Sequence, residues 1–165
     1  MKLAPHDMRS RLERERSVRL GTVDETGGAH MVPVIFVVDG DVFYSPTDRP
    51  RNGAPRPKRL RNLDRDPRVT VLADLYDDDW LKAWWVRLRG TARIIGEGPE
   101  RTRALGLLDG KYPQFDGPRY LTDGGPVLAV DIKDWLGWAF SDQPAPAPSP
   151  APRRRPWHRR WRRSG

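Results

Sequence analysis

The 165-residue sequence contains no cysteine, which excludes disulfide bonds, thiolate metal sites and a cysteine nucleophile. Its three histidines, His6, His30 and His158, are too scattered along the chain for a zinc site. Long apolar runs are also missing. No stretch approaches the roughly 18 apolar residues of a membrane span, and the charged N-terminus lacks the apolar core of a signal peptide. We therefore expect a cytoplasmic protein without a membrane span.

Positive charge is abundant but unevenly placed. The formal net charge is +8, yet residues 143–165 carry seven of the 30 basic residues and no acidic residue. Residues 1–142 are therefore almost neutral as a whole. The charge of the complete chain consequently does not indicate by itself that the folded part binds nucleic acid.

A stretch rich in proline and alanine precedes the basic C-terminal end. After residue 142, proline alternates with small residues, and Arg153–Arg163 then combines arginine with Trp157 and Trp161. Such a composition cannot bury a core, so we predict one domain over residues 1–142 and a linker with a disordered tail over residues 143–165. The tail resembles segments that contact single-stranded nucleic acid or an anionic surface, and it also fits an extension without function.

Apolar periodicity predicts a mainly β domain with a few short helices. Alternation is clearest over residues 68–75 and 84–95. Further strands are expected at residues 18–23, 31–38, 42–45 and within 127–140, and helices at residues 5–17, 58–65 and 98–110. Pro33 interrupts the second strand and indicates an edge, a bulge or a bend, because proline cannot donate a ladder hydrogen bond.

Residues 49–68 carry eight basic side chains and form a candidate anion site. Arginine and lysine beside serine and threonine supply the charge-assisted donors that a phosphate group needs. The composition alone also fits an ordinary basic helix that faces water.

Six short segments follow one another in a characteristic order and spacing. They are Leu20–Val23, His30–Val34, Asp41–Ser45, Lys58–Leu63, Asp66–Val69 and Trp84–Ala92. In this order they resemble the pyridoxamine-phosphate-oxidase-like split β-barrel family, in particular its deazaflavin (F420) branch. The resemblance implies a six-stranded antiparallel split barrel of the FMN-binding type, paired into a homodimer whose two cofactor sites lie at the interface.

The same resemblance implies which residues hold the cofactor. Its phosphate would meet the end of the third strand and the basic helix, at Ser45, Thr47, Arg56, Lys58, Arg59 and Asn62. Whether Lys58 or Arg59 takes the phosphate stays open. The ring would lie against the second and fifth strands, at His30, Val32, Pro33, Val34, Trp85 and Arg87. His30 also fits a purely structural histidine, and Trp85 also fits a core or dimer contact.

We therefore expect an F420-dependent oxidoreductase that transfers a hydride between the reduced deazaflavin and a small organic acceptor at the dimer interface. No catalytic side chain is expected, because the cofactor carries the reactive atom. The surplus of basic residues favours F420 with its polyanionic tail, and FMN stays the alternative, in an oxidase or a flavin reductase. A cofactor-binding module without enzymatic activity is the third interpretation.

Overall fold

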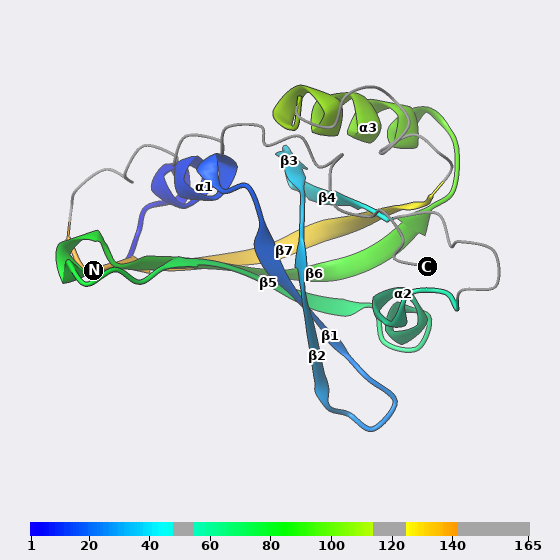
Figure 1. Ribbon diagram of the computed structural model, residues 1–165, viewed down its shortest axis with the longest axis horizontal. Coiled ribbons are helices and arrows are strands. Elements are labelled where there is room, and N and C mark those ends of the chain that lie inside the picture. The colour runs from blue at the N-terminus through cyan, green and yellow to red at the C-terminus, as the bar shows by residue number, and fades with distance from the viewer. Residues whose placement is uncertain (48–54, 114–124, 142–165) are drawn as a thin grey trace, which may run out of the picture.

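Strands are the main secondary structure in the computed structural model, which describes residues 1–47, 55–113 and 125–141 (Figure 1). In chain order the elements are α1 (Pro5–Arg14), β1 (Val18–Val23), β2 (Ala29–Val34), β3 (Val37–Asp39), β4 (Val42–Pro46), α2 (Lys58–Leu63), β5 (Arg68–Leu75), the 3-10 helix η1 (Trp80–Lys82), β6 (Trp84–Ile95), α3 (Pro99–Lys111) and β7 (Val127–Ala139). The predicted linker and basic tail, residues 143–165, lie outside the described residues.

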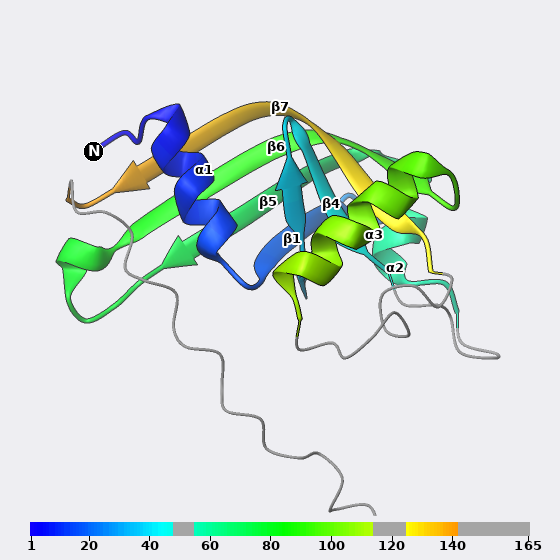
Figure 2. The same ribbon diagram turned by 90° about the horizontal axis from the view of Figure 1, so that it is seen from above.

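One antiparallel sheet contains all seven of these strands, in the order β2-β1-β5-β6-β7-β4-β3. β2 and β3 lie at opposite edges of the sheet, although only Ile35 and Phe36 separate them in the chain. A residue spans at most about 3.6 Å, so two residues cannot bridge a flat sheet of this width. The sheet must therefore curl until its edges approach each other, as in a barrel. Figure 2 shows this curvature along β6 and β7.

The predicted fold class is confirmed, with seven strands where six were expected. β1, β5 and β6 have the predicted bounds. The additional strand arises because the expected strand over residues 31–38 is interrupted at Ile35 and Phe36. The backbone of Phe36 has left the ladder there, and the Tyr112 hydroxyl accepts from its N–H and donates to its carbonyl oxygen, both at 2.9 Å.

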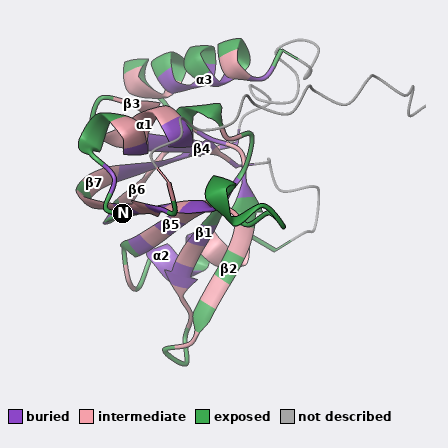
Figure 3. Cartoon of the chain, turned by 90° about the vertical axis from the view of Figure 1, so that its left-hand side faces the viewer, coloured by how far each residue is buried: buried purple, intermediate pink, exposed green. Residues whose placement is uncertain are grey.

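The main core fills the inner face of the curled sheet. Alternate residues of β1, β5 and β6 point into it and are fully buried, namely Val18, Leu20, Val71, Val86 and Leu88. Met8 and Leu12 of α1 join the same core. Burying one such side chain contributes about 1.5–3 kcal/mol, so the alternation decides which face of each strand turns inward. β2 is an edge strand, and Figure 3 shows it as largely exposed or half-buried.

A second core lies between α3 and the outer side of β4 and β7. Ala104, Leu105 and Leu108 of the helix pack with Tyr44 and Ala129 of the two strands. Phe43 of β4 points to the main core instead. β4 is therefore buried on both faces, in agreement with the apolar residues at its start.

A β-bulge interrupts the pairing of β6 and β7. Arg89 pairs with Asp134, but the next residue, Gly90, pairs with Ile132. Ile132 and Trp135 both pack against the main core. The two residues between them, Lys133 and Asp134, consequently lie together on the outer side of the sheet.

Gly90 allows the two strands to approach closely at the bulge. A Cβ atom at this position would lie 2.4 Å from the carbonyl oxygen of Asp131. We expect Gly90→Ala to lower the free energy of unfolding by about 1–3 kcal/mol, because backbone atoms must move to relieve this overlap. Chemical denaturation followed by tryptophan fluorescence measures the change.

Gly106→Ala in α3 is the matched control, since a Cβ atom there meets nothing within 4 Å. This substitution should raise the stability by about 0.5–1 kcal/mol, because alanine loses less backbone entropy than glycine in a helix. If Gly90→Ala were as stable as the unchanged protein, the close approach of β6 and β7 would be wrong.

Candidate functional site

The basic helix α2 lies at the end of the sheet where β4 ends. Figures 1 and 2 both place it there, away from α1. The helix begins after Pro57 and ends before Pro67, which disfavours helical geometry in the residue before it. Leu60, Asn62 and Leu63 are its buried residues. The helix is therefore held against the barrel by a buried face that contains one polar side chain.

Asn62 connects α2 to the first two strands through a buried hydroxyl. Its Nδ2 donates a hydrogen bond of 2.9 Å to Oγ1 of Thr22 in β1. The same Thr22 oxygen lies 3.3 Å from Nδ1 of His30, its partner in the ladder with β2. The structure thus brings two predicted site residues, Asn62 and His30, together around Thr22.

Thr22 was missed by the sequence analysis. The signal was present, because Thr22 follows Val18 and Leu20 at the next inward-facing position of β1 and is only 3% exposed. A polar residue at an inward position needs a partner, but the sequence did not show that α2 would supply it.

Lys58 and Arg56 have carboxylate partners, in the β1–β2 hairpin and directly after α2. Nζ of Lys58 lies 3.4 Å from Oδ2 of Asp24 and 3.9 Å from Oε1 of Glu25. Arg56 forms an ion pair with Asp64. An anionic ligand at Lys58 would therefore compete with the hairpin carboxylates.

Asp24 organises the hairpin from within. Its carboxylate accepts hydrogen bonds from the hydroxyl and backbone N–H of Thr26 and from the backbone N–H of Gly28. These bonds, with a smaller contribution from Lys58, hold the pKa of Asp24 well below its usual range. Asp24 is therefore ionised wherever the protein is folded at neutral pH.

Ser45 and Thr47 are buried at the end of β4. The backbone N–H of Thr47 donates to the carbonyl oxygen of Pro126 at 3.0 Å. Its side-chain oxygen and Oδ1 of Asn62 are buried atoms without a hydrogen-bond partner among the described residues. Arg59 is half-buried on α2.

The predicted ring contacts lie on different surfaces. His30, Val32 and Val34 alternate on one face of β2, and Val34 belongs to the main core, whereas Pro33 is exposed on the other face. Two further predicted contacts, Trp85 and Arg87, are half-buried on the outer face of β6. Trp85 pairs with Asp74 near the C-terminal end of β5, while α2 precedes the N-terminal end of that strand. The described residues therefore do not gather the six positions into one surface.

A groove of about 590 Å³ lies on the outer face of the sheet, outside all twelve predicted positions. Its volume is within the range of small-molecule sites. Its lining includes Gly21, Val23, Met31, Arg68, Arg89 and Lys133. They come from five strands, which is why no local sequence pattern indicated the groove.

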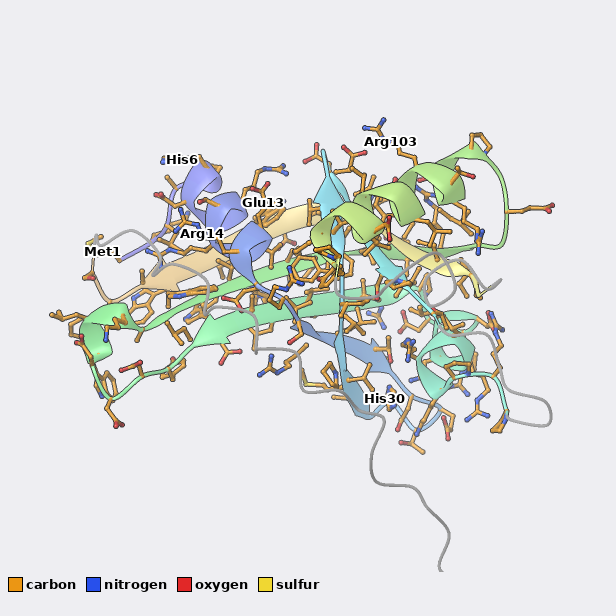
Figure 4. All side chains as sticks on the ribbon, turned by 45° about the horizontal axis from the view of Figure 1, so that its top comes forward. Met1, His6, Glu13, Arg14, His30 and Arg103 are labelled. Carbon is orange, nitrogen blue, oxygen red and sulfur yellow. The ribbon has the colours of Figure 1, made fainter. Side chains whose placement is uncertain are left out.

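The described residues contain neither a metal-binding cluster nor a membrane-spanning helix. They contain no group of three His, Asp or Glu side chains that could hold a metal ion. His6 and His30 lie on opposite sides of the molecule (Figure 4). None of the helices in the described ranges is long and apolar enough to cross a membrane.

A curled antiparallel sheet whose edge strands are consecutive in the chain, with a basic helix beside the first hairpin, defines a split β-barrel. The sequence pattern of the pyridoxamine 5'-phosphate oxidase family matches residues 4–138. The chain belongs to this family, as the resemblance predicted.

Solved structures with the same fold have diverse descriptions. A Bacteroides thetaiotaomicron protein, provisionally described as a 5-nitroimidazole antibiotic resistance protein, superposes with a TM-score of 0.70 at 18% identity, over 83% of this chain and 85% of its own. The haem storage protein HutZ of Vibrio cholerae superposes with a TM-score of 0.61 at 16% identity, over 84% of this chain and 95% of its own. An FAD-binding protein of Mesorhizobium loti superposes with a TM-score of 0.58 at 16% identity, over 83% of this chain and 95% of its own. No curated protein matches the sequence.

The low pKa of Asp24 predicts a pH-dependent contribution to stability. An aspartate with a lowered pKa stabilises the folded state above its unfolded value of about 3.9, and this contribution is lost as the pH falls toward the folded value. We expect Asp24→Asn to lower the thermal unfolding midpoint at pH 7 and the difference to shrink below about pH 4.

Calorimetry at several pH values measures this difference. Asp78→Asn is the control, because Asp78 is an exposed aspartate in the turn between β5 and η1 and should change little at any pH. A difference for Asp24→Asn that stays constant between pH 7 and pH 3 would contradict the assignment.

Proposed function

We propose that this protein binds a phosphate-bearing cofactor of the flavin type, F420 in the first place, and transfers a hydride between it and a small organic acceptor. One observation carries the proposal. At one end of the barrel, a basic helix lies near two buried side-chain oxygens, on Thr47 and Asn62, that have no hydrogen-bond partner among the described residues. An unpaired buried polar group costs about 1–3 kcal/mol, so such atoms indicate a site that a ligand or ordered water completes.

The residues at this end suit the polar part of such a cofactor. Lys58 and Arg59 supply positive charge, and the hydroxyl groups of Ser45 and Thr47 can donate to phosphate oxygens. Oδ1 of Asn62 accepts, which fits a hydroxyl or N–H donor of the ligand. These side chains would bind and orient the cofactor.

Hydride transfer needs no acidic or basic side chain from this chain, because a bound flavin or deazaflavin supplies that chemistry. The task left to the protein is to position the ring and to exclude water from it. We propose that a homodimer completes this enclosure, with the two sites at the interface.

Titration of the full-length protein with each cofactor tests the proposal. F420 fluorescence should be quenched on binding, whereas a protein that is purified yellow with flavin absorbance would select FMN. Binding of neither cofactor would refute the proposal.

Deleting residues 143–165 should leave the cofactor affinity unchanged, because we propose that the basic tail is an accessory.

A double substitution tests the phosphate position. Lys58→Ala with Arg59→Ala should weaken cofactor binding by about 1.5–3 kcal/mol for each charge-assisted hydrogen bond that is lost. Arg61→Ala is the matched control, because Arg61 is an exposed cation on the same helix. Fluorescence titration measures the dissociation constants, and circular dichroism checks the fold. Equal affinities for the double variant and the control would place the phosphate elsewhere.

A further inference from the structure

The bulge in β7 brings a lysine into the outer groove. In a regular strand the neighbours Lys133 and Asp134 would point to opposite faces of the sheet. Here the bulge places both of them on the outer side, between the inward-facing Ile132 and Trp135. Both face the region between β6 and β7 where Arg89 lies. The extra residue in β7 thus places two charged side chains of this strand, instead of one, on the outer side.

The charges around the groove are mostly neutralised in pairs. Nη2 of Arg89 lies 2.9 Å from a carboxylate oxygen of Asp134. Nη2 of Arg68 lies 2.6 Å from Asp66, and the hydrogen bonds from Arg68 lower the pKa of Asp66 to about 2. Lys133 forms no ion pair with any described residue. Among the described residues, the groove therefore carries one positive charge without an ion-pair partner, at the position that the bulge creates.

The opposite side of the groove is apolar. Met31 of β2 and Val23 of β1 line it, and Gly21 adds no side chain beside them. A Cβ atom at Gly21 would contact the carbonyl oxygen of Thr70 at 3.4 Å and the Met31 side chain at 3.9 Å. Gly21 therefore leaves room on this side of the groove, and the groove combines an apolar side with one cation that has no ion-pair partner among the described residues.

We propose that this groove binds a small organic anion, a carboxylate or sulfonate on a flat apolar body, and that Lys133 contacts the anionic group. The apolar body lies on Gly21 and against Met31. Arg89 stays with Asp134, so Lys133 is the residue that selects for negative charge. That this anion is the hydride acceptor rests on the proposed function. That the groove binds the anion does not depend on the proposed function.

Binding of 8-anilinonaphthalene-1-sulfonate tests the site, because this probe carries one sulfonate on an apolar aromatic body and fluoresces when it leaves water. The full-length protein without added cofactor is titrated. We expect saturable binding, a dissociation constant about three- to tenfold higher for Lys133→Gln, and a larger loss for Met31→Glu, which places a negative charge on the apolar side. The affinity of the unchanged protein should fall with added salt.

Lys82→Gln is the matched control, because Lys82 is also an exposed lysine but pairs with Asp77 and Asp79 at the other end of β6. Its dissociation constant should equal that of the unchanged protein. Absence of saturable binding, as when a second copy of the chain covers the groove, would overturn the proposal, and so would equal affinities for Lys133→Gln and Lys82→Gln. Either result would leave the cofactor titrations of the Lys58 and Arg59 variant unchanged. The groove proposal can therefore be refuted while the proposed function stands, and the reverse also holds.

Discussion

The closure of the barrel depends on one hydroxyl group. β2 and β3 belong to opposite edges of the sheet, and the two residues that join them must leave the ladder. Phe36 is fully buried there, stacked on Phe43 with ring centroids 5.2 Å apart. Its backbone groups are both satisfied by Tyr112, at the end of α3. Burial raises the pKa of Tyr112, so the hydroxyl keeps its proton at neutral pH and can donate as well as accept.

The closed barrel has an apolar inner face and a charged outer face, and β1 contributes residues to both faces. Thr22 points inward to Asn62 of α2, while the neighbouring Gly21 forms the floor of the outer groove. The proposed cofactor end and the proposed anion groove are therefore separated by the thickness of one strand. Two ligands held there would be near each other, because Thr22 also lines the groove.

The two regions differ in how their cations are held. Lys58 of α2 has carboxylate neighbours in the hairpin, so an anion must replace them. Lys133 has none among the described residues, and its charge is available without such an exchange. The surplus charge of the chain is therefore a poor guide to its sites, because the carboxylate partners of each cation decide how readily it can contact an anion.

Alternation of apolar residues was sufficient to predict β1, β5 and β6, because each strand buries one face and the burial energy of every second residue acts in the same direction. The order of short motifs was sufficient for the family. Only the tertiary structure decided that the strand over residues 31–38 is two strands, that Thr22 joins Asn62 to His30, and that a bulge turns Lys133 outward. Each of these depends on contacts between residues far apart in the chain, whose free energy is gained only after the sheet has curled and which leave no periodic pattern in the sequence.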